Sequence, residues 1–180
     1  MNKPLQLLVV LLLVCSYACK KAEDSTTLVL PKTFPLDIDS DDAPEFQTAY
    51  PQYVIDGAGF SGLGTNASIR SLNREKHHLI GFFAVADTIK FDTEIIATGS
   101  GREIHLASIV QYSYDNFKVP EKWEVKTPEQ ATETFIGYQL VDDTNEVKIG
   151  WIKVRVNDRD GSITLLETEP PVQADFVIVK

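Results

Sequence analysis

The amino-acid sequence predicts an all-β protein: a single antiparallel domain of the β-sandwich or jelly-roll-like kind that follows an N-terminal signal peptide. Three observations lead to this prediction. Several short segments are rich in β-branched and aromatic residues, and some of them alternate apolar with polar side chains. Turn-forming residues separate these segments, and stretches with a helical period are scarce. Many short strands divided by turns are typical of sandwiches and jelly rolls.

The first 18 residues have the layout of a secretory signal peptide. A basic start precedes an unbroken apolar run over residues 7–14, and the small residues Ser16 and Ala18 stand just before Cys19. The apolar run is shorter than the roughly 20 residues that a membrane-spanning helix needs. The segment resembles the bacterial lipobox, which implies that Cys19 is lipidated and becomes the first residue of the mature chain. The alternative is an ordinary secreted protein in which Cys19 has no such role.

Composition limits what the exported part can be. Cys15 and Cys19 are the two cysteines of the chain, so residues 28–180, the predicted β-sandwich domain, have no disulfide. Residues 19–27 are polar and are expected to form a tether. The formal net charge of −9 argues against nucleic acid as a partner and is compatible with cation binding. Membrane attachment is expected through the lipid on Cys19 rather than through basic side chains.

An acidic stretch precedes the first strong strand signals. Counted from Asp37, the aspartates Asp37, Asp39 and Asp41 occupy positions 1, 3 and 5, and Glu45 occupies position 9. The spacing resembles the D-x-D-x-D-G-x-x-D calcium loop of many exported β proteins. Alternate residues of a tight loop can turn their carboxylates inward, where Ca²⁺ takes six to eight oxygen ligands at about 2.3–2.6 Å. By this interpretation the backbone carbonyl of Ala43, at position 7, is a further ligand.

The acidic stretch departs from the calcium-loop pattern at two positions. Asp42 stands where the pattern has glycine, so we expect it to adopt a left-handed conformation at some cost. Glu45 replaces the usual aspartate and is one methylene longer. Two alternatives stay open: a solvated acidic turn without an ion, and catalytic carboxylates such as the paired acids of a glycosidase.

Two other patterns carry weaker signals. Residues 57–62 match G-x-G-x-x-G by letter, but no amphipathic helix follows, so a flexible loop or bulge is expected instead of a dinucleotide site. His77 and His78 are adjacent in a predicted strand and would point to opposite faces, which disfavours a shared zinc ion with His105.

Aromatic residues offer a candidate carbohydrate platform, although core packing is the more common role for such side chains. The candidates are Tyr50, Tyr53, Tyr112, Tyr114 and Trp123.

The later part of the chain supplies most of the predicted strands. They cover residues 78–85, 104–114, 135–141, 147–149, 152–156, 162–167 and 175–180. The alternation changes phase between Trp151 and Ile152, which predicts a bulge or a strand end covered on both faces. Turns are expected at 142–145 and at Asp160-Gly161, and one helical turn at 127–131 with Thr127 as its N-cap.

Three segments of this part resemble a known family. FIGY at 135–138, GWIKV at 150–154 and GSITL at 161–165 are similar to the end of the β-sandwich domains of choice-of-anchor surface proteins of bacteria. Taken back to the acidic stretch, the resemblance covers about residues 28–180. It implies an exported β-sandwich attached to the cell envelope.

Together these patterns predict a lipid-anchored, exported β-sandwich protein of the cell envelope, held at the outer membrane and facing the periplasm or the exterior. We expect a calcium-stabilised binding or structural module with a glycan or protein ligand, and the sequence favours this over an enzyme. The alternatives are a carbohydrate-active enzyme that uses carboxylates, and an adhesin or assembly subunit that uses a sheet edge.

Overall fold

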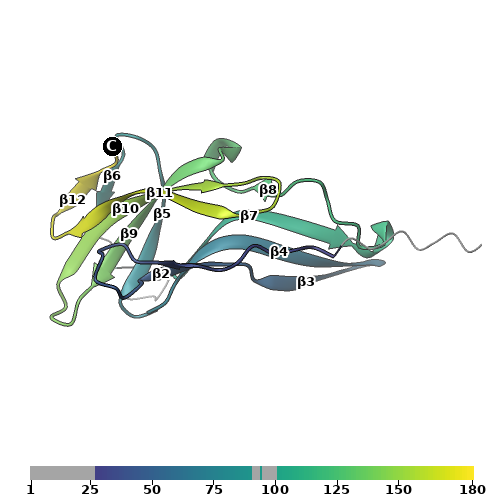
Figure 1. Cartoon of the computed structure of the whole chain (residues 1–180), viewed down its shortest axis with the longest axis horizontal. Helices are drawn as coiled ribbons and strands as arrows, with labels where there is room; N and C mark the ends of the chain where they lie inside the picture. The colour runs from purple at the N-terminus through teal and green to yellow at the C-terminus, as the bar shows by residue number, and fades with distance from the viewer. Residues whose placement is uncertain (1–26, 91–93, 95–100) are drawn as a thin grey trace, which may run out of the picture.

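A computed structural model describes residues 27–90, 94 and 101–180, and in it the chain is all-β, as predicted (Figure 1). The predicted signal peptide, Cys19 and all but the last residue of the tether lie outside the described residues. Within the described part, no helix has the length and apolar character needed to cross a membrane.

Twelve strands and two short 3₁₀ helices make up the described chain. They are β1 (Pro35–Leu36), β2 (Phe46–Ala49), β3 (Gln52–Gly57), β4 (Phe60–Ser71), β5 (His77–Phe83), β6 (Thr88–Lys90), β7 (Glu103–Tyr112), η1 (Ser113–Asp115), β8 (Glu124–Val125), η2 (Pro128–Gln130), β9 (Glu133–Val141), β10 (Val147–Val156), β11 (Ile163–Val172) and β12 (Phe176–Ile178).

The strands form three antiparallel sheets. The first has the order β1-β2-β4-β7-β8, and β3 pairs with β4 beside β2. The second has the order β11-β10-β9-β5, and the third is the pair β12-β6. Along β4, β2 pairs with residues 68–71 and β3 pairs with residues 60–65, so the two short strands share one edge of the longest strand.

Apolar side chains from the first two sheets form the main core, and the β12-β6 pair covers a second, smaller core. β10 contributes to both. Trp151 belongs to the smaller core and its neighbour Ile152 to the main one, and the pairing with β11 shifts register between Ile149 and Trp151. The extra residue of that shift lies on β11, because β10 pairs with β9 without interruption. The predicted phase change therefore reflects burial of β10 on both faces, and the bulge is in the neighbouring strand β11.

The glycine-rich segment corrects one prediction. Residues 57–62 are not a flexible loop; they are the end of β3, a two-residue turn at Ala58 and Gly59, and the start of β4. Gly59 has φ +89°, a conformation that glycine adopts without steric cost. The prediction missed β3 because its apolar run is only the three residues 53–55, and β4 because its apolar residues are interrupted by glycine and polar residues.

The predicted helical turn is a 3₁₀ turn, and Thr127 precedes it as the N-cap residue, as predicted. The Thr127 hydroxyl donates to the carbonyl of Ala131 and accepts no backbone N–H of the turn. Thr127 is therefore the N-cap by position, without the side-chain hydrogen bond that often accompanies this role. The predicted turns are confirmed: β9 and β10 are joined through residues 142–146, and Gly161 has φ +74° between β10 and β11.

Candidate metal centre

The acidic stretch is the loop that joins β1 to β2. Leu36 pairs with Phe46 across the two strands, and the Glu45 N–H donates to the Leu36 carbonyl at 3.1 Å. Leu36, Phe46 and the loop residue Ile38 are buried in the main core. The loop is therefore attached to the core at both ends and once in between, which leaves its aspartates on the solvent side and Glu45 buried.

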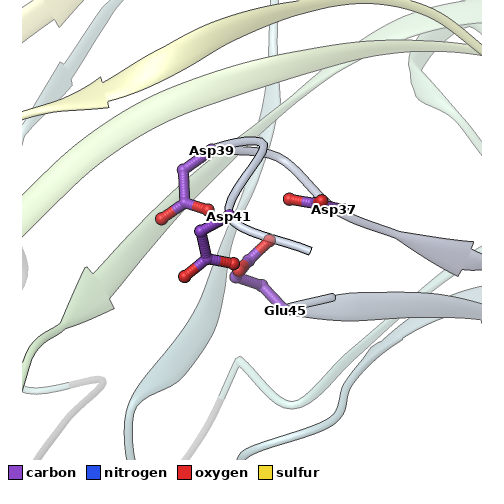
Figure 2. A group of neighbouring side chains, drawn as sticks. All are labelled: Asp37, Asp39, Asp41 and Glu45. Atoms are coloured by element: carbon purple, nitrogen blue, oxygen red, sulfur yellow. The ribbon is translucent and has the colours of Figure 1, made fainter. Parts of the chain in front are cut away.

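The four predicted acidic ligands come together. One carboxylate oxygen each from Asp37, Asp39, Asp41 and Glu45 lies within 4.8 Å of the others, and this is the one such group found in the described part of the chain. Figure 2 shows the four side chains gathered within the loop, with Glu45 at the start of β2. We call them the acidic cluster. The arrangement could hold a metal ion, as the sequence predicted.

Backbone N–H groups of the loop already bind three of these carboxylates. Asp37 accepts from Ser40 at 2.8 Å and from Asp42 at 3.0 Å. Asp41 accepts from Ala43 at 2.8 Å, and Glu45 accepts from Ile38 at 2.8 Å. Each carboxylate has about four lone-pair sites, so these bonds orient the groups and leave acceptor sites free for a cation.

The loop backbone is strained at two positions. Ser40 has φ 64° and Asp42 has φ 67°, both in the left-handed region. The expectation for Asp42, at the position where calcium loops have glycine, is therefore confirmed. Ala43 lines a hollow beside the cluster, and the role of its carbonyl as a ligand stays a prediction.

Like charges and burial work against ionisation of two cluster members. Burial is the main cause that raises the pKa of Glu45, which is 4% exposed, and repulsion from Asp39 and Asp37 adds to it, although the Ile38 N–H opposes the shift. Desolvation by nearby loop atoms, followed by repulsion from Asp41, raises the pKa of Asp39. Ionising the cluster therefore costs free energy that a bound cation would offset.

Basic side chains do not supply that compensation. Among the residues that the structure describes, none of the four carboxylates forms an ion pair with Lys, Arg or His. Lys76 and Lys148 both line the same hollow, but the Lys76 ammonium group pairs with Asp143, and Lys148 is not within ion-pair distance of the four carboxylates. Within the described part of the chain, the cluster thus carries several negative charges and no cationic side chain in direct ion-pair contact.

The hollow beside the cluster has a volume of about 270 Å³. The loop forms one wall, and the end of β9 with the β9–β10 turn forms another. Two acids of that turn have other partners. The Thr144 hydroxyl donates to Asp142 at 2.6 Å and is the main cause that lowers its pKa, with the Glu146 and Thr144 N–H groups adding to it. Asp143 binds Lys76. A general acid opposite the cluster would need a raised pKa instead.

The histidines do not form a metal site. His77 lies beside the loop, with Nδ1 at 3.1 Å from the Glu45 carbonyl, and burial lowers its pKa. His78 is buried in β5, and His105, on β7, lies near Asn66 of β4. The packing of His77 against the loop was missed because the sequence gives no register between β5 and β2.

The five aromatic candidates do not form one platform. Trp123 is buried in the main core and contacts Tyr50 with ring centroids 6.5 Å apart, so core packing is the role of this pair. Tyr112 and Tyr114 stack on each other at the outer end of β7, 5.0 Å apart. Tyr53 lies on β3 across from Gly64.

Comparisons with protein-family models, with curated proteins and with solved structures returned no match to this chain. The resemblance to choice-of-anchor domains and to the lipobox therefore stays a prediction from the sequence.

Proposed function

We propose that this chain is an exported lipoprotein of the bacterial cell envelope, and that its β-sandwich is stabilised by calcium bound in the acidic cluster. The domain would act as a binding or structural module, held at the outer membrane through the lipid on Cys19. One observation carries the metal part of the proposal. Four carboxylates, one of them buried, converge within 4.8 Å without an ion pair in the described chain.

The donor set favours calcium over other cations. All four side chains offer oxygen, which suits hard cations, and no cysteine or histidine belongs to the group. Ca²⁺ accepts irregular geometry with six to eight ligands, so the four carboxylates, the Ala43 carbonyl and water would complete it. Mg²⁺ needs near-ideal octahedral geometry and keeps several waters. A weak site would still fill outside the cell, where sites with dissociation constants on the order of 10⁻⁴–10⁻³ M are common.

Calcium titration by calorimetry tests the metal site. Protein stripped with EDTA should bind about one calcium ion, and the Asp37→Ala/Asp39→Ala variant should bind none. Glu121→Ala/Asp175→Ala removes the same charge from exposed positions away from the loop and serves as the matched control. Binding that survives in the loop variant, or that the control also loses, would show that the acidic cluster is not the calcium site.

Cell fractionation tests the anchor. The wild-type protein should be recovered with membranes and should incorporate labelled fatty acid, whereas Cys19→Ala should do neither and should appear in soluble fractions. Membrane recovery that does not change in Cys19→Ala would overturn the lipid attachment.

The two alternative functions meet specific obstacles. The catalytic alternative needs an opposed acid, and the two nearest candidates, Asp142 and Asp143, are held by other partners. The adhesin alternative needs an open sheet edge, and β11 is a ten-residue edge strand. However, Pro170 and Pro171 lack backbone donors, which makes this edge a poor template for a further strand.

A further inference from the structure

One end of the molecule presents a cluster of aromatic side chains. Tyr112 and Tyr114 stack with an interplanar angle of 13°, and Phe60 contacts both edge-on, with centroid distances of 6.0 and 6.5 Å. Phe117 follows, and its N–H donates to the Tyr112 carbonyl. We call these four residues the aromatic tip. It lies where β3 turns into β4 and where β7 runs into η1 (Figure 1).

The aromatic tip is exposed, although a hydrogen bond joins the two segments that form it. Tyr114 is 73% exposed, Phe117 43% and Phe60 39%. The Ser61 N–H donates to Ser113 Oγ at 2.9 Å, which joins the β3–β4 hairpin to η1. Several large aromatic side chains held in water at one place indicate a contact surface, since scattered single residues are the normal case.

The N-terminal segment approaches the same end. Leu36 pairs with Phe46 and the Phe34 N–H donates to Thr48 Oγ1, so the chain before β1 runs back along β4 toward Phe60. Figure 1 agrees: along the long axis, the described chain begins toward the end that carries η1 and the β3–β4 turn. The β1–β2 loop, with the acidic cluster, lies toward the opposite end of β4.

The length of chain between Cys19 and the described residues limits how far a lipid on Cys19 can lie from the domain. Eight peptide steps separate Cys19 from Thr27, which is at most about 29 Å of fully extended chain. The twelve residues of β4 span about 40 Å. Because the described chain begins toward the aromatic tip, a lipid on Cys19 favours an orientation in which this tip, rather than the far end of β4, lies toward the bilayer.

We infer that the aromatic tip inserts into the headgroup layer of the membrane that holds the lipid anchor. The inference rests on the proposed lipidation of Cys19. Tyrosine and phenylalanine suit this layer, where an aromatic ring meets apolar and polar surroundings at once. The contact does not depend on basic residues, which fits a chain of net charge −9 and predicts insertion into uncharged phosphatidylcholine. The acidic cluster then faces away from the bilayer.

Tryptophan probes at the two ends test this orientation. Lipidated mature protein, beginning at Cys19, would be reconstituted into phosphatidylcholine vesicles that carry a nitroxide quencher near the headgroup. Tyr114→Trp places a probe at the aromatic tip, and Leu72→Trp places one at an exposed position just beyond β4, at the opposite end. The native Trp123 and Trp151 are 3% and 1% exposed, and their emission in the wild type is subtracted.

The inference predicts a clear loss of the added emission for Tyr114→Trp and little loss for Leu72→Trp. Vesicle flotation of wild type and Cys19→Ala distinguishes a failure of the lipid anchor from a failure of tip insertion. If flotation does not require Cys19, the proposed anchor fails. If flotation requires Cys19 but the two probes are quenched equally, or neither is quenched, the inference alone is overturned. A Tyr114→Trp signal that responds to soluble oligosaccharides and not to vesicles would assign the aromatic tip to a glycan and also overturn it.

Discussion

At the scale of single residues, Glu45 is the most informative side chain of the loop. Its carboxylate accepts the Ile38 N–H at 2.8 Å, so it helps to fix the loop, yet its ionised form is buried beside Asp37 and Asp39. The hydrogen bond favours the folded loop, whereas the charge opposes it when no cation is bound. Removing the charge while keeping the acceptor separates the two effects.

Glu45→Gln should therefore have opposite effects with and without calcium. Its amide oxygen can still accept the Ile38 N–H, so in EDTA at pH 7 the variant should melt above the wild type. In calcium the order should reverse, because the variant has lost a charged ligand. Circular dichroism melts in both conditions measure this, with Glu121→Gln as an exposed control. Destabilisation of the same size in both conditions would reduce Glu45 to a hydrogen-bonding residue.

The raised pKa values of Glu45 and Asp39 also predict a pH dependence. In EDTA, their contribution to stability is fully present below the unfolded-state values, about 3.9 for Asp and 4.3 for Glu, and is lost as the pH rises through the raised folded-state values. Calcium needs the ionised carboxylates. The difference in melting temperature between calcium and EDTA should thus grow from pH 4.5 to pH 7 in the wild type. A difference that is constant over this range would contradict the assignment.

At the scale of elements, the sequence predicts strands whose own residues form an apolar run. It misses strands that are covered by apolar side chains of neighbouring strands. β9 and β10 have β-branched and aromatic runs, so their positions are predicted closely. β4 is the longest strand but contains Gly62 and Gly64, and its apolar cover comes from aromatic rings of neighbouring strands: a Cβ at Gly64 would lie 2.1 Å from the Tyr53 ring. Such cover depends on strand register, which one sequence does not supply.

The acidic loop could be predicted better, because its four acidic residues are close in sequence and their contacts do not depend on strand register. The spacing of Asp37, Asp39, Asp41 and Glu45 is sufficient to predict that their carboxylates converge. The neighbours of the loop could not be predicted, since His77 and the β9–β10 turn reach it only through tertiary packing.

Two glycines should respond differently to substitution by alanine. A Cβ at Gly150 would lie 2.4 Å from the Tyr138 hydroxyl and 2.8 Å from the Glu169 carbonyl, inside packed β10. Gly150→Ala should cost about 1–3 kcal/mol of unfolding free energy, as overpacked cores do. Gly64→Ala should cost less, because the ring it meets, Tyr53, is 37% exposed and can move. Urea unfolding midpoints measure both, and equal losses would contradict this account of the two close approaches.

At the scale of the whole molecule, β4 separates two ends with different roles. The acidic cluster stands at one end, and the aromatic tip with the approach of the N-terminal segment stands at the other. The proposed lipid would hold one end at the membrane, and the proposed calcium ion would order the loop at the other. The predicted domain has no disulfide, so a cation is the available cross-link for that loop.

Thermal unfolding of the purified protein in calcium and in EDTA tests the central claim most directly. A ligand that binds only the folded state adds about 2.7 kcal/mol at a hundredfold excess over its dissociation constant, which is about 5–10 °C for a domain of this size. We predict that shift for the wild type and for Glu121→Ala/Asp175→Ala, and none for Asp37→Ala/Asp39→Ala. If the wild type melts at the same temperature in calcium and in EDTA, the acidic cluster is a solvated turn and not a structural calcium site.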